Sequence, residues 1–418
     1  MKLFNRTITS QGSSIFKTFL LIGLILSPLK LIEGIAFAGS SDRAIEVASW
    51  LKVEAEVFEV WTSEEISPER VRFTKADGAQ SAGELSDSSA NKTVLFIFPK
   101  KSSAYNTALS TSLRVFADRD IFPKVEVVLM EKDNNKRLEV IEAAEAEGVD
   151  LIFATGSSSA KFAFNNYWGG RIPVVTICAK DPVMLGQMPA YNVGSGSNIA
   201  FTSLNVPVGL QGRYLKELNP NLRNVAVLFA NENKSAIKTQ YEPLVAWGKE
   251  HGVNVLGVGV SQKHAADELA EVVPSAVEKM RLTDSTLKES IFWITGSTSV
   301  FREIATVNAH SSTVPVLSVV PDVVKAGNDT AVMSIGVGFQ SNAQLAAIYG
   351  VNVLTGKTRV GDLPVGLVEP PDIAISFLKA REIGMKVPFS FLERASTIYG
   401  NSGAIARSKG KNLVAEVD

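Results

Sequence analysis

Residues that build most metal and redox sites are scarce in this sequence. Its 418 residues include one cysteine, Cys178, and three histidines. One cysteine excludes a disulfide within the chain and a metal site made of several thiolates, and its place in the apolar run PVVTIC favours a buried small hydrophobe. No two histidines have the spacing of zinc ligands, and the phosphate loop G-x-x-x-x-G-K-[ST] is missing. We therefore expect neither a metal nor a cofactor.

Neither sign of charge dominates the sequence. The formal net charge at pH 7 is −1, so the chain as a whole does not favour nucleic acid or acidic membranes as partners. The length exceeds that of one ordinary core and fits two domains. A hydrophobic fraction of 45% supplies enough side chains for a buried interior.

Long hydrophobic runs are also lacking. The most apolar segment, residues 18–26, has about half of the roughly 20 residues that a membrane span needs. Basic residues precede it and an A-x-A motif follows at residues 36–38, an order typical of an export signal. We expect a signal peptide over residues 1–38, cleavage after Ala38, a periplasmic or secreted mature protein, and no stable membrane insertion after cleavage.

The region after this signal has an unusual composition. Residues 41–91 contain eleven acidic and five basic residues. Alternation in KVEAEVFEV (52–60) predicts a strand, with VRFT (71–74) as its pairing partner. The small polar residues of 77–91 predict a linker. We interpret residues 39–91 as an accessory acidic segment and linker.

From residue 92 onward, short apolar runs alternate with runs of helical periodicity. The apolar runs are residues 93–99, 125–130, 151–155, 172–179, 224–231, 253–260, 290–295 and 314–320. Strands that are apolar on both faces and alternate with helices are typical of parallel sheets covered on both sides. The sequence therefore predicts an α/β fold.

Two stretches of the chain repeat one pattern. LIFATGSSSA (151–160) and IFWITGSTSV (291–300) each place Thr-Gly-Ser directly after an apolar run, and Gly156 and Gly296 are 140 residues apart. A Pro-Val pair opens the next strand in both halves, at a spacing of 142 residues. We infer two similar Rossmann-like lobes.

Both repeated junctions are candidate ligand contacts. Ligands of parallel α/β sheets bind outside the carboxyl ends of the strands. Glycine there allows close approach of the backbone, and the following serine offers a hydroxyl and an N–H to an anion such as a carboxylate. The alternative is an ordinary turn with a helix cap.

Two aspartates also follow strands in matching positions of the two halves. Asp181 and Asp322 could each pair with a ligand ammonium, or each could cap a turn. Tyr105 follows a predicted strand near the expected ligand cleft, where it could stack on a ligand or pack in the core.

A serine hydrolase is a remote alternative. GSSSA (156–160) loosely fits the G-x-S-x-G elbow, with Ser158 as the nucleophile. A triad needs a histidine, but His251, His264 and His310 stand at predicted helix ends in the other half of the chain. We expect the protein not to be an enzyme.

Five segments carry a resemblance to a known family. They are GVDLIFATGSSSA, IPVVTICAKDPV, LKELNPNLRNVAVLFANEN, LTGKTRVGDLPV and FLKAREIGMKVPFSFLERASTIY. Over about residues 92–399 the chain resembles ABC-transporter substrate-binding proteins of the periplasmic-binding-protein type 1 fold, in the branch that includes tryptophan and tyrosine receptors. The resemblance implies two lobes joined by a hinge, with a small organic ligand, often an amino acid, enclosed between them.

The resemblance and the strand pattern together imply a division of the chain and a set of cleft residues. Lobe 1 is expected to comprise residues 92–203 and 338–365, lobe 2 residues 204–337 and 366–399, and a polar tail residues 400–418. The expected ligand-binding residues are Ser102, Ser103, Tyr105, Thr155, Gly156, Ser157, Ser158, Asp181, Asn231, Thr295, Gly296, Ser297 and Asp322.

These features lead to one functional expectation and one alternative. We expect an exported solute-binding protein that captures a small polar, amino-acid-like molecule and delivers it to an ABC permease. The segments FIFPKKSSAYN and FNNYWGGR depart from the family pattern and leave the ligand open. The alternative is a periplasmic ligand sensor that acts through a signalling partner, with residues 41–91 as a contact surface.

Overall fold

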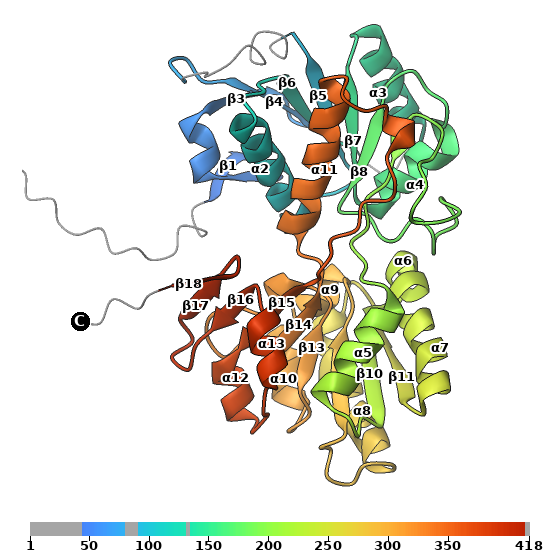
Figure 1. Ribbon diagram of the computed structural model, residues 1–418, viewed down its shortest axis with the longest axis vertical. Coiled ribbons are helices and arrows are strands. Elements are labelled where there is room, and N and C mark those ends of the chain that lie inside the picture. Colours follow the sequence, from blue (N-terminus) through green and yellow to red (C-terminus); the bar gives the residue numbers. More distant parts are fainter. Residues whose placement is uncertain (1–43, 80–90, 131–133, 414–418) are drawn as a thin grey trace, which may run out of the picture. The chain divides into compact units, whose positions relative to one another are not determined.

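The computed structural model describes residues 44–79, 91–130 and 134–413 (Figure 1). The signal peptide expected over residues 1–38 lies outside the described residues. Within them, two large mixed sheets of mostly parallel strands are packed with helices, which confirms the predicted α/β class. We call the sheet built from the first half of the chain sheet 1 and the other sheet 2.

Sheet 1 has the strand order β3-β4-β6-β5-β7-β8-β9. Its strands are β3 (Trp61–Ser67), β4 (Arg70–Lys75), β5 (Thr93–Phe98), β6 (Lys124–Leu129), β7 (Leu151–Thr155), β8 (Val174–Ile177) and β9 (Ile199–Ala200). The strands β5 to β9 run parallel and are buried along most of their length, as their apolar runs predict. The helices of this part are α2 (Ser103–Asp118), α3 (Asn134–Ala146), α4 (Gly156–Asn166) and α11 (Phe339–Leu354).

The acidic N-terminal region extends sheet 1. Strands β3 and β4 form a hairpin whose second strand pairs antiparallel with β6, while β1 (Ala44–Ala48) and β2 (Leu51–Glu54) form a separate pair. The predicted strand over 52–60 is wrong after Glu54, where a 3₁₀ helix (Ala55–Glu59) begins. The predicted pairing of 71–74 with it is also wrong, because β4 buries Val71 and Phe73 and finds its partners in β3 and β6.

A buried carboxylate holds this extension to the rest of sheet 1. Glu126 of β6 is only 3% exposed and accepts hydrogen bonds from the Arg72 guanidinium at 3.0 and 3.1 Å. Arg70 and Lys124 lie 3.3 and 3.6 Å from the same carboxylate. This buried charge is therefore paired and hydrogen-bonded by residues of β4, the strand that pairs with β6.

Sheet 2 has the order β11-β10-β12-β13-β14-β15-β16-β17-β18. Its strands are β10 (Asn224–Ala230), β11 (Asn254–Val260), β12 (Ser290–Ile294), β13 (Val316–Ser318), β14 (Met333–Gly336), β15 (Asp372–Ser376), β16 (Thr397–Tyr399), β17 (Ile405–Ser408) and β18 (Lys411–Asn412). Strands β10 to β14 are parallel. The last two strands lie in the region expected to be a polar tail, and they pair antiparallel at the edge of the sheet.

Helices and short turns surround sheet 2. They are α5 (Val208–Leu218), α6 (Lys234–Ala236), a π-helical turn (Ile237–Tyr241), α7 (Glu242–His251), α8 (Ala265–Arg281), α9 (Thr298–Phe301), α10 (Ile304–His310), a 3₁₀ turn η3 (Pro321–Val323), α12 (Phe377–Glu382) and α13 (Phe389–Arg394). A further 3₁₀ turn, η4 (Val360–Asp362), follows α11.

The chain passes between the two sheets in three places within the described residues. The passages are 201–207, which follow β9, 337–338, which precede α11, and 363–371, which precede β15 (Figure 1). Buried amides fasten the first passage: Asn205 Nδ2 donates to Thr239 O at 3.1 Å, and Asn342 Nδ2 donates to Ser203 O at 3.2 Å. We call sheet 1 with α2, α3, α4 and α11 lobe 1, and sheet 2 with its helices lobe 2.

Among the described residues, no helix combines the length and the apolar character that a transmembrane crossing requires.

Candidate functional site

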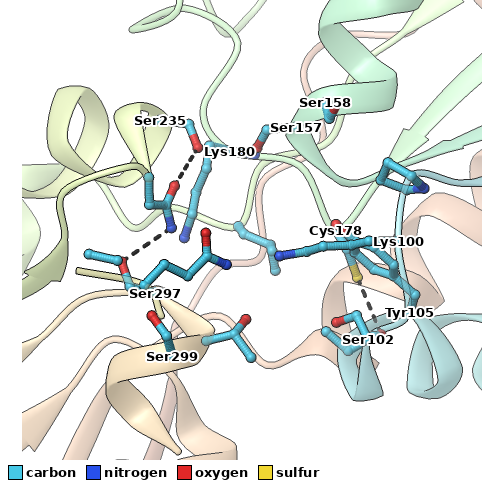
Figure 2. A pocket seen from close by; sticks show the side chains of 18 of the residues that line it. Lys100, Ser102, Tyr105, Ser157, Ser158, Cys178, Lys180, Ser235, Ser297 and Ser299 are labelled. Carbon is cyan, nitrogen blue, oxygen red and sulfur yellow. Dashed lines mark hydrogen bonds between the residues drawn. The ribbon is translucent and has the colours of Figure 1, made fainter. Parts of the chain in front are cut away.

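A cavity of about 300 Å³ lies where loops at the strand ends of both sheets meet (Figure 2). Lobe 1 and the passages contribute Pro99, Lys100, Ser102, Ala104, Tyr105, Ser157, Ser158, Cys178, Lys180, Leu204 and Phe339. Lobe 2 contributes Ala230, Glu232, Asn233, Ser235, Gln262, Gly296, Ser297, Thr298 and Ser299. A cavity of this volume suits a small organic molecule.

The cavity brings together six of the residues expected from the sequence. They are Ser102, Tyr105, Ser157, Ser158, Gly296 and Ser297. Both Thr-Gly-Ser junctions therefore contribute to one cavity, the first through the start of α4 and the second through the loop before α9. Figure 2 shows Ser102 and Tyr105 on one side of the pocket and Ser297 and Ser299 on the other.

Gly156 supports the pocket without lining it. Its φ of +76° lies in the left-handed region, and a Cβ atom there would overlap the Tyr105 hydroxyl. Glycine is required for both reasons, because only glycine adopts this φ freely and leaves the space. Tyr105 packs its ring against Phe98 at 5.5 Å between centroids, and burial raises the pKa of Tyr105. Its hydroxyl therefore stays protonated and able to donate toward the cavity.

We predict that Gly156→Ala destabilises the protein by about 1–2 kcal/mol through the left-handed backbone alone, and weakens ligand binding by displacing Tyr105. Gly148→Ala is the matched control, because Gly148 has a φ of +72° and open space where a Cβ atom would stand. Urea denaturation and a ligand titration check both effects. Equal losses of stability and equal affinities in the two variants would contradict a role for Gly156 beyond its backbone.

Gly296 makes room for a side chain from the other lobe. A Cβ atom on Gly296 would overlap Nζ of Lys180, which follows β8 of lobe 1. The Gly296 N–H donates to Gln240 Oε1 at 2.9 Å, which fixes this junction against the π-helical turn. The two repeated glycines therefore have similar roles. Gly156 leaves space for the side chain of Tyr105 at one strand end, and Gly296 leaves space for that of Lys180 at the other.

Lys180 is the most unusual residue of the pocket. It is 8% exposed, and burial lowers the pKa of its amine to about 8. Its backbone N–H donates to Ser157 Oγ at 3.0 Å, and the chain reaches it through Cys178, whose φ of +55° turns the backbone at the end of β8. Among the described residues, the Lys180 amine has no hydrogen-bond or ion-pair partner. A buried cation without a partner is costly.

Lobe 2 presents its polar groups through a hydrogen-bonded set of loops. Asn233 Nδ2 donates to Ser297 Oγ at 3.2 Å, and the Ser235 hydroxyl donates to Asn233 Oδ1 at 3.0 Å. Thr295 Oγ1 lies 3.0 Å from Ser297 Oγ, behind the lining. Ser299 Oγ is buried without a partner among the described residues. The pocket therefore holds a hydroxyl with unused hydrogen-bonding capacity.

The structure does not bring Asp181 to the cavity. Its carboxylate is buried and accepts from the N–H groups of Val183 and Met184 at 2.9 and 3.0 Å. The Tyr191 hydroxyl donates to its other oxygen at 2.7 Å. These bonds are all internal, so the turn-capping alternative describes this residue.

The other expected residues lie around the cavity without lining it. Thr155 and Thr295 are fully buried, and Ser103 and Asn231 are exposed beside the lining residues. Asp322 is exposed in the turn η3 after β13. These positions are at strand ends, as the sequence indicates, but their side chains do not line the cavity.

Sequence reasoning missed several lining residues, above all Lys180, Lys100, Asn233, Ser235, Gln262 and Ser299. Asn233 and Ser235 follow the end of β10, so the strand-end rule applied to β10 could have found them. Lys180 stands in the segment IPVVTICAKDPV, directly before Asp181, to which the strand-end rule assigned the ligand contact. The direction of the Lys180 side chain depends on the turn at Cys178, for which the sequence has no signal.

The geometry gives the hydrolase alternative no support. Ser158 Oγ lies 3.5 Å from Nη2 of Arg137. None of the three histidines lines the cavity, and the ring of His251 bonds to Trp247 O at 2.8 Å in lobe 2. Among the described residues, Ser158 has no histidine to act as its base.

Two α/β lobes with a pocket at facing strand ends define the class of type 1 periplasmic binding proteins. The family model for ABC transporter substrate binding protein matches residues 119–398. The chain belongs to this family, as its sequence motifs predict. Family members are substrate-binding proteins, and the coarse expectation of a solute-binding protein is confirmed.

Solved structures share the fold. A conserved domain protein from Vibrio cholerae is 16% identical, with a TM-score of 0.56 over 74% of this chain and 99% of that one. The ABC domain from Streptococcus pneumoniae in complex with L-Trp is 19% identical, with a TM-score of 0.56 over 74% and 99%. A ligand-free, open substrate-binding protein with adhesive properties from Clostridium difficile is 18% identical, with a TM-score of 0.55 over 73% and 98%. The comparison with curated protein sequences found no match.

Proposed function

We propose that this protein is an exported solute receptor that encloses one small polar organic molecule and delivers it to an ABC transporter permease. The observation that carries the proposal is one cavity lined by both lobes in which polar groups remain unused. Seven of its twenty lining residues are serine or threonine. Hydroxyls of this kind fix the orientation of a small polar ligand.

Ligand contacts from both sides supply the physical basis for delivery. Lobe 1 offers Ser102 and Ser158, and lobe 2 offers Ser297 and Ser299. A molecule that touches both sets binds a closed arrangement of the lobes better than an open one, so it shifts the population toward closure. A permease that recognises the closed form would then receive loaded protein only.

Export is the second part of the proposal. The n-region, the apolar run and the A-x-A motif of residues 1–38 support cleavage after Ala38 and a periplasmic location. A receptor that scavenges solutes for an importer works on that side of the membrane.

Native mass spectrometry of residues 39–418, purified without denaturant, tests the proposal. We expect one bound small molecule per chain, and a higher melting temperature than that of protein freed of ligand by unfolding and refolding. L-tryptophan is one compound to add back, since the Streptococcus pneumoniae relative was solved with it. Absence of any bound molecule, together with no stabilisation by any added solute, would contradict the proposal.

A further inference from the structure

The charge balance of the pocket is positive. Two lysines line the cavity, Lys100 and Lys180, against one carboxylate, Glu232. Glu232 is exposed, and its Oε2 already accepts from the Gln262 N–H at 2.9 Å. Figure 2 shows both lysine side chains extending into the pocket. The lining side chains therefore include one more basic than acidic residue.

Lys180 is placed so that its amine serves an occupant of the pocket. Its carbon chain is buried, and its amine lies against Gly296 of the other lobe without a partner among the described residues. The carboxylate of the adjacent residue, Asp181, accepts hydrogen bonds from three other groups and does not pair with Lys180. Among the described residues the amine meets no acceptor and lines the cavity, where an occupant can pair with it.

Two helix N-termini also face the pocket. The long helices α2 and α4 begin at the pocket, where Ser102 and Ala104 line it from one helix and Ser157 and Ser158 from the other. Helix N-termini carry partial positive charge and free N–H groups. The hydroxyl of Ser299, buried and without a partner in the described part of the chain, adds a further donor.

We propose that the ligand is a small organic anion whose carboxylate or phosphate contacts Lys180 Nζ. This inference rests on the proposed function and names its substrate class. The pocket favours such anions over zwitterionic amino acids, because an α-ammonium beside the bound carboxylate would meet the Lys180 ammonium, and like charges in close contact are unfavourable. It favours them over neutral polyols, which would leave the cation unpaired.

The test combines charge-matched probes with Lys180 variants. The probes are indole-3-propionate, indole-3-propionamide, L-tryptophan, benzoate, benzamide, glycerol 3-phosphate, glycerol and inorganic phosphate, measured by calorimetry on the full mature chain together with any co-purified ligand. We expect binding by anions, and a loss of about 30-fold or more in their affinity in Lys180→Met, the size of a lost charge-assisted bond. Lys263→Met, an exposed lysine next to the lining residue Gln262, is the control and should bind as the native protein does.

A second variant separates charge from placement. Gly296→Ala keeps the amine but fills the space that its Nζ occupies, so anion affinity should fall while the net charge is unchanged. It also keeps the inference testable if Lys180→Met folds poorly, which circular dichroism would reveal.

The outcomes distinguish the inference from the function on which it rests. The carboxylate probes and the phosphate probes are compared as two groups, and preferential binding of either group supports the anion site. A ligand that is neutral, zwitterionic or cationic, or that binds Lys180→Met as tightly as the native protein, overturns the inference and leaves the receptor function standing. If no compound of any charge binds and none co-purifies, both fail.

Discussion

Replacing Asp181 by alanine is expected to lower the free energy of unfolding by about 3–5 kcal/mol and to leave the ligand affinity of the folded protein nearly unchanged. The substitution would remove the acceptor of three donors, the N–H groups of Val183 and Met184 and the hydroxyl of Tyr191. Each loses its carboxylate acceptor at a residue that is only 1% exposed. Urea denaturation of the ligand-free protein measures the effect.

Two milder variants calibrate this result. Tyr191→Phe removes only the hydroxyl that donates to Asp181, so a loss of about 1–2 kcal/mol is expected. Asp181→Asn keeps an oxygen that the two backbone N–H groups can use, so its loss should be intermediate. If Asp181→Ala instead keeps its stability and loses ligand affinity, the carboxylate acts on the ligand and the capping role is wrong.

Replacing Lys180 by methionine is expected to have the opposite effect on the ligand-free protein, which should become more stable. The pKa of Lys180 falls from 10.5 to about 8 through burial, a difference that corresponds to about 3 kcal/mol of unfavourable free energy for the charged folded form. Methionine has a similar length and carries no charge. The native protein therefore sacrifices stability at Lys180, as binding sites commonly do.

The pH dependence of this difference identifies its cause. Below pH 8 the lysine is charged in the folded and the unfolded chain, so the folded state bears the full cost of burying the charge. The free energy of unfolding of Lys180→Met should then be about 3 kcal/mol higher than that of the native protein. Between pH 8 and 10.5 the unfolded state binds more protons, so the stability of the native protein rises relative to the variant. Above pH 10.5 the difference should vanish.

Because the native protein and Lys180→Met differ only at residue 180, the contributions of all other titrating groups cancel in the difference between their stabilities. The remaining titratable side chains that line the pocket are Lys100, Tyr105, Cys178 and Glu232, and both proteins contain them. Lys263→Met should track the native protein at every pH, because that lysine is exposed. If the difference in free energy of unfolding between the native protein and Lys180→Met stays constant from about pH 6 to 10.5, the difference is caused by packing and not by charge.

The strands and their order along the chain could be predicted from the sequence because their information is local. Runs such as TVLFIF and SIFWI are apolar on both faces, and this pattern occurs where helices cover both sides of a parallel sheet. The strand-end rule led to Ser157, Ser158 and Ser297, which line the cavity because the turn and the first helical residues follow directly from the strand.

Pairing at the sheet edge needed tertiary information. The alternation in residues 52–60 predicts one strand, yet the chain leaves it after Glu54 for a 3₁₀ turn. Strand β4 pairs with β6, which lies about fifty residues later and supplies Glu126 for Arg70 and Arg72. A local sequence pattern does not specify which distant strand has an unpaired edge to which a new strand can bond.

The sequence by itself determined the two-lobed α/β class, the family and the strand ends at which the cavity lies, because these depend on apolar runs, glycines and motifs that are read in order along the chain. Only the tertiary structure decided which of two adjacent charged residues faces the pocket. Asp181 turns toward the donors of Val183, Met184 and Tyr191. Lys180 extends toward the cavity, where Gly296 of the other lobe leaves space for it. Neighbours in the sequence point in opposite directions when their partners come from different parts of the fold.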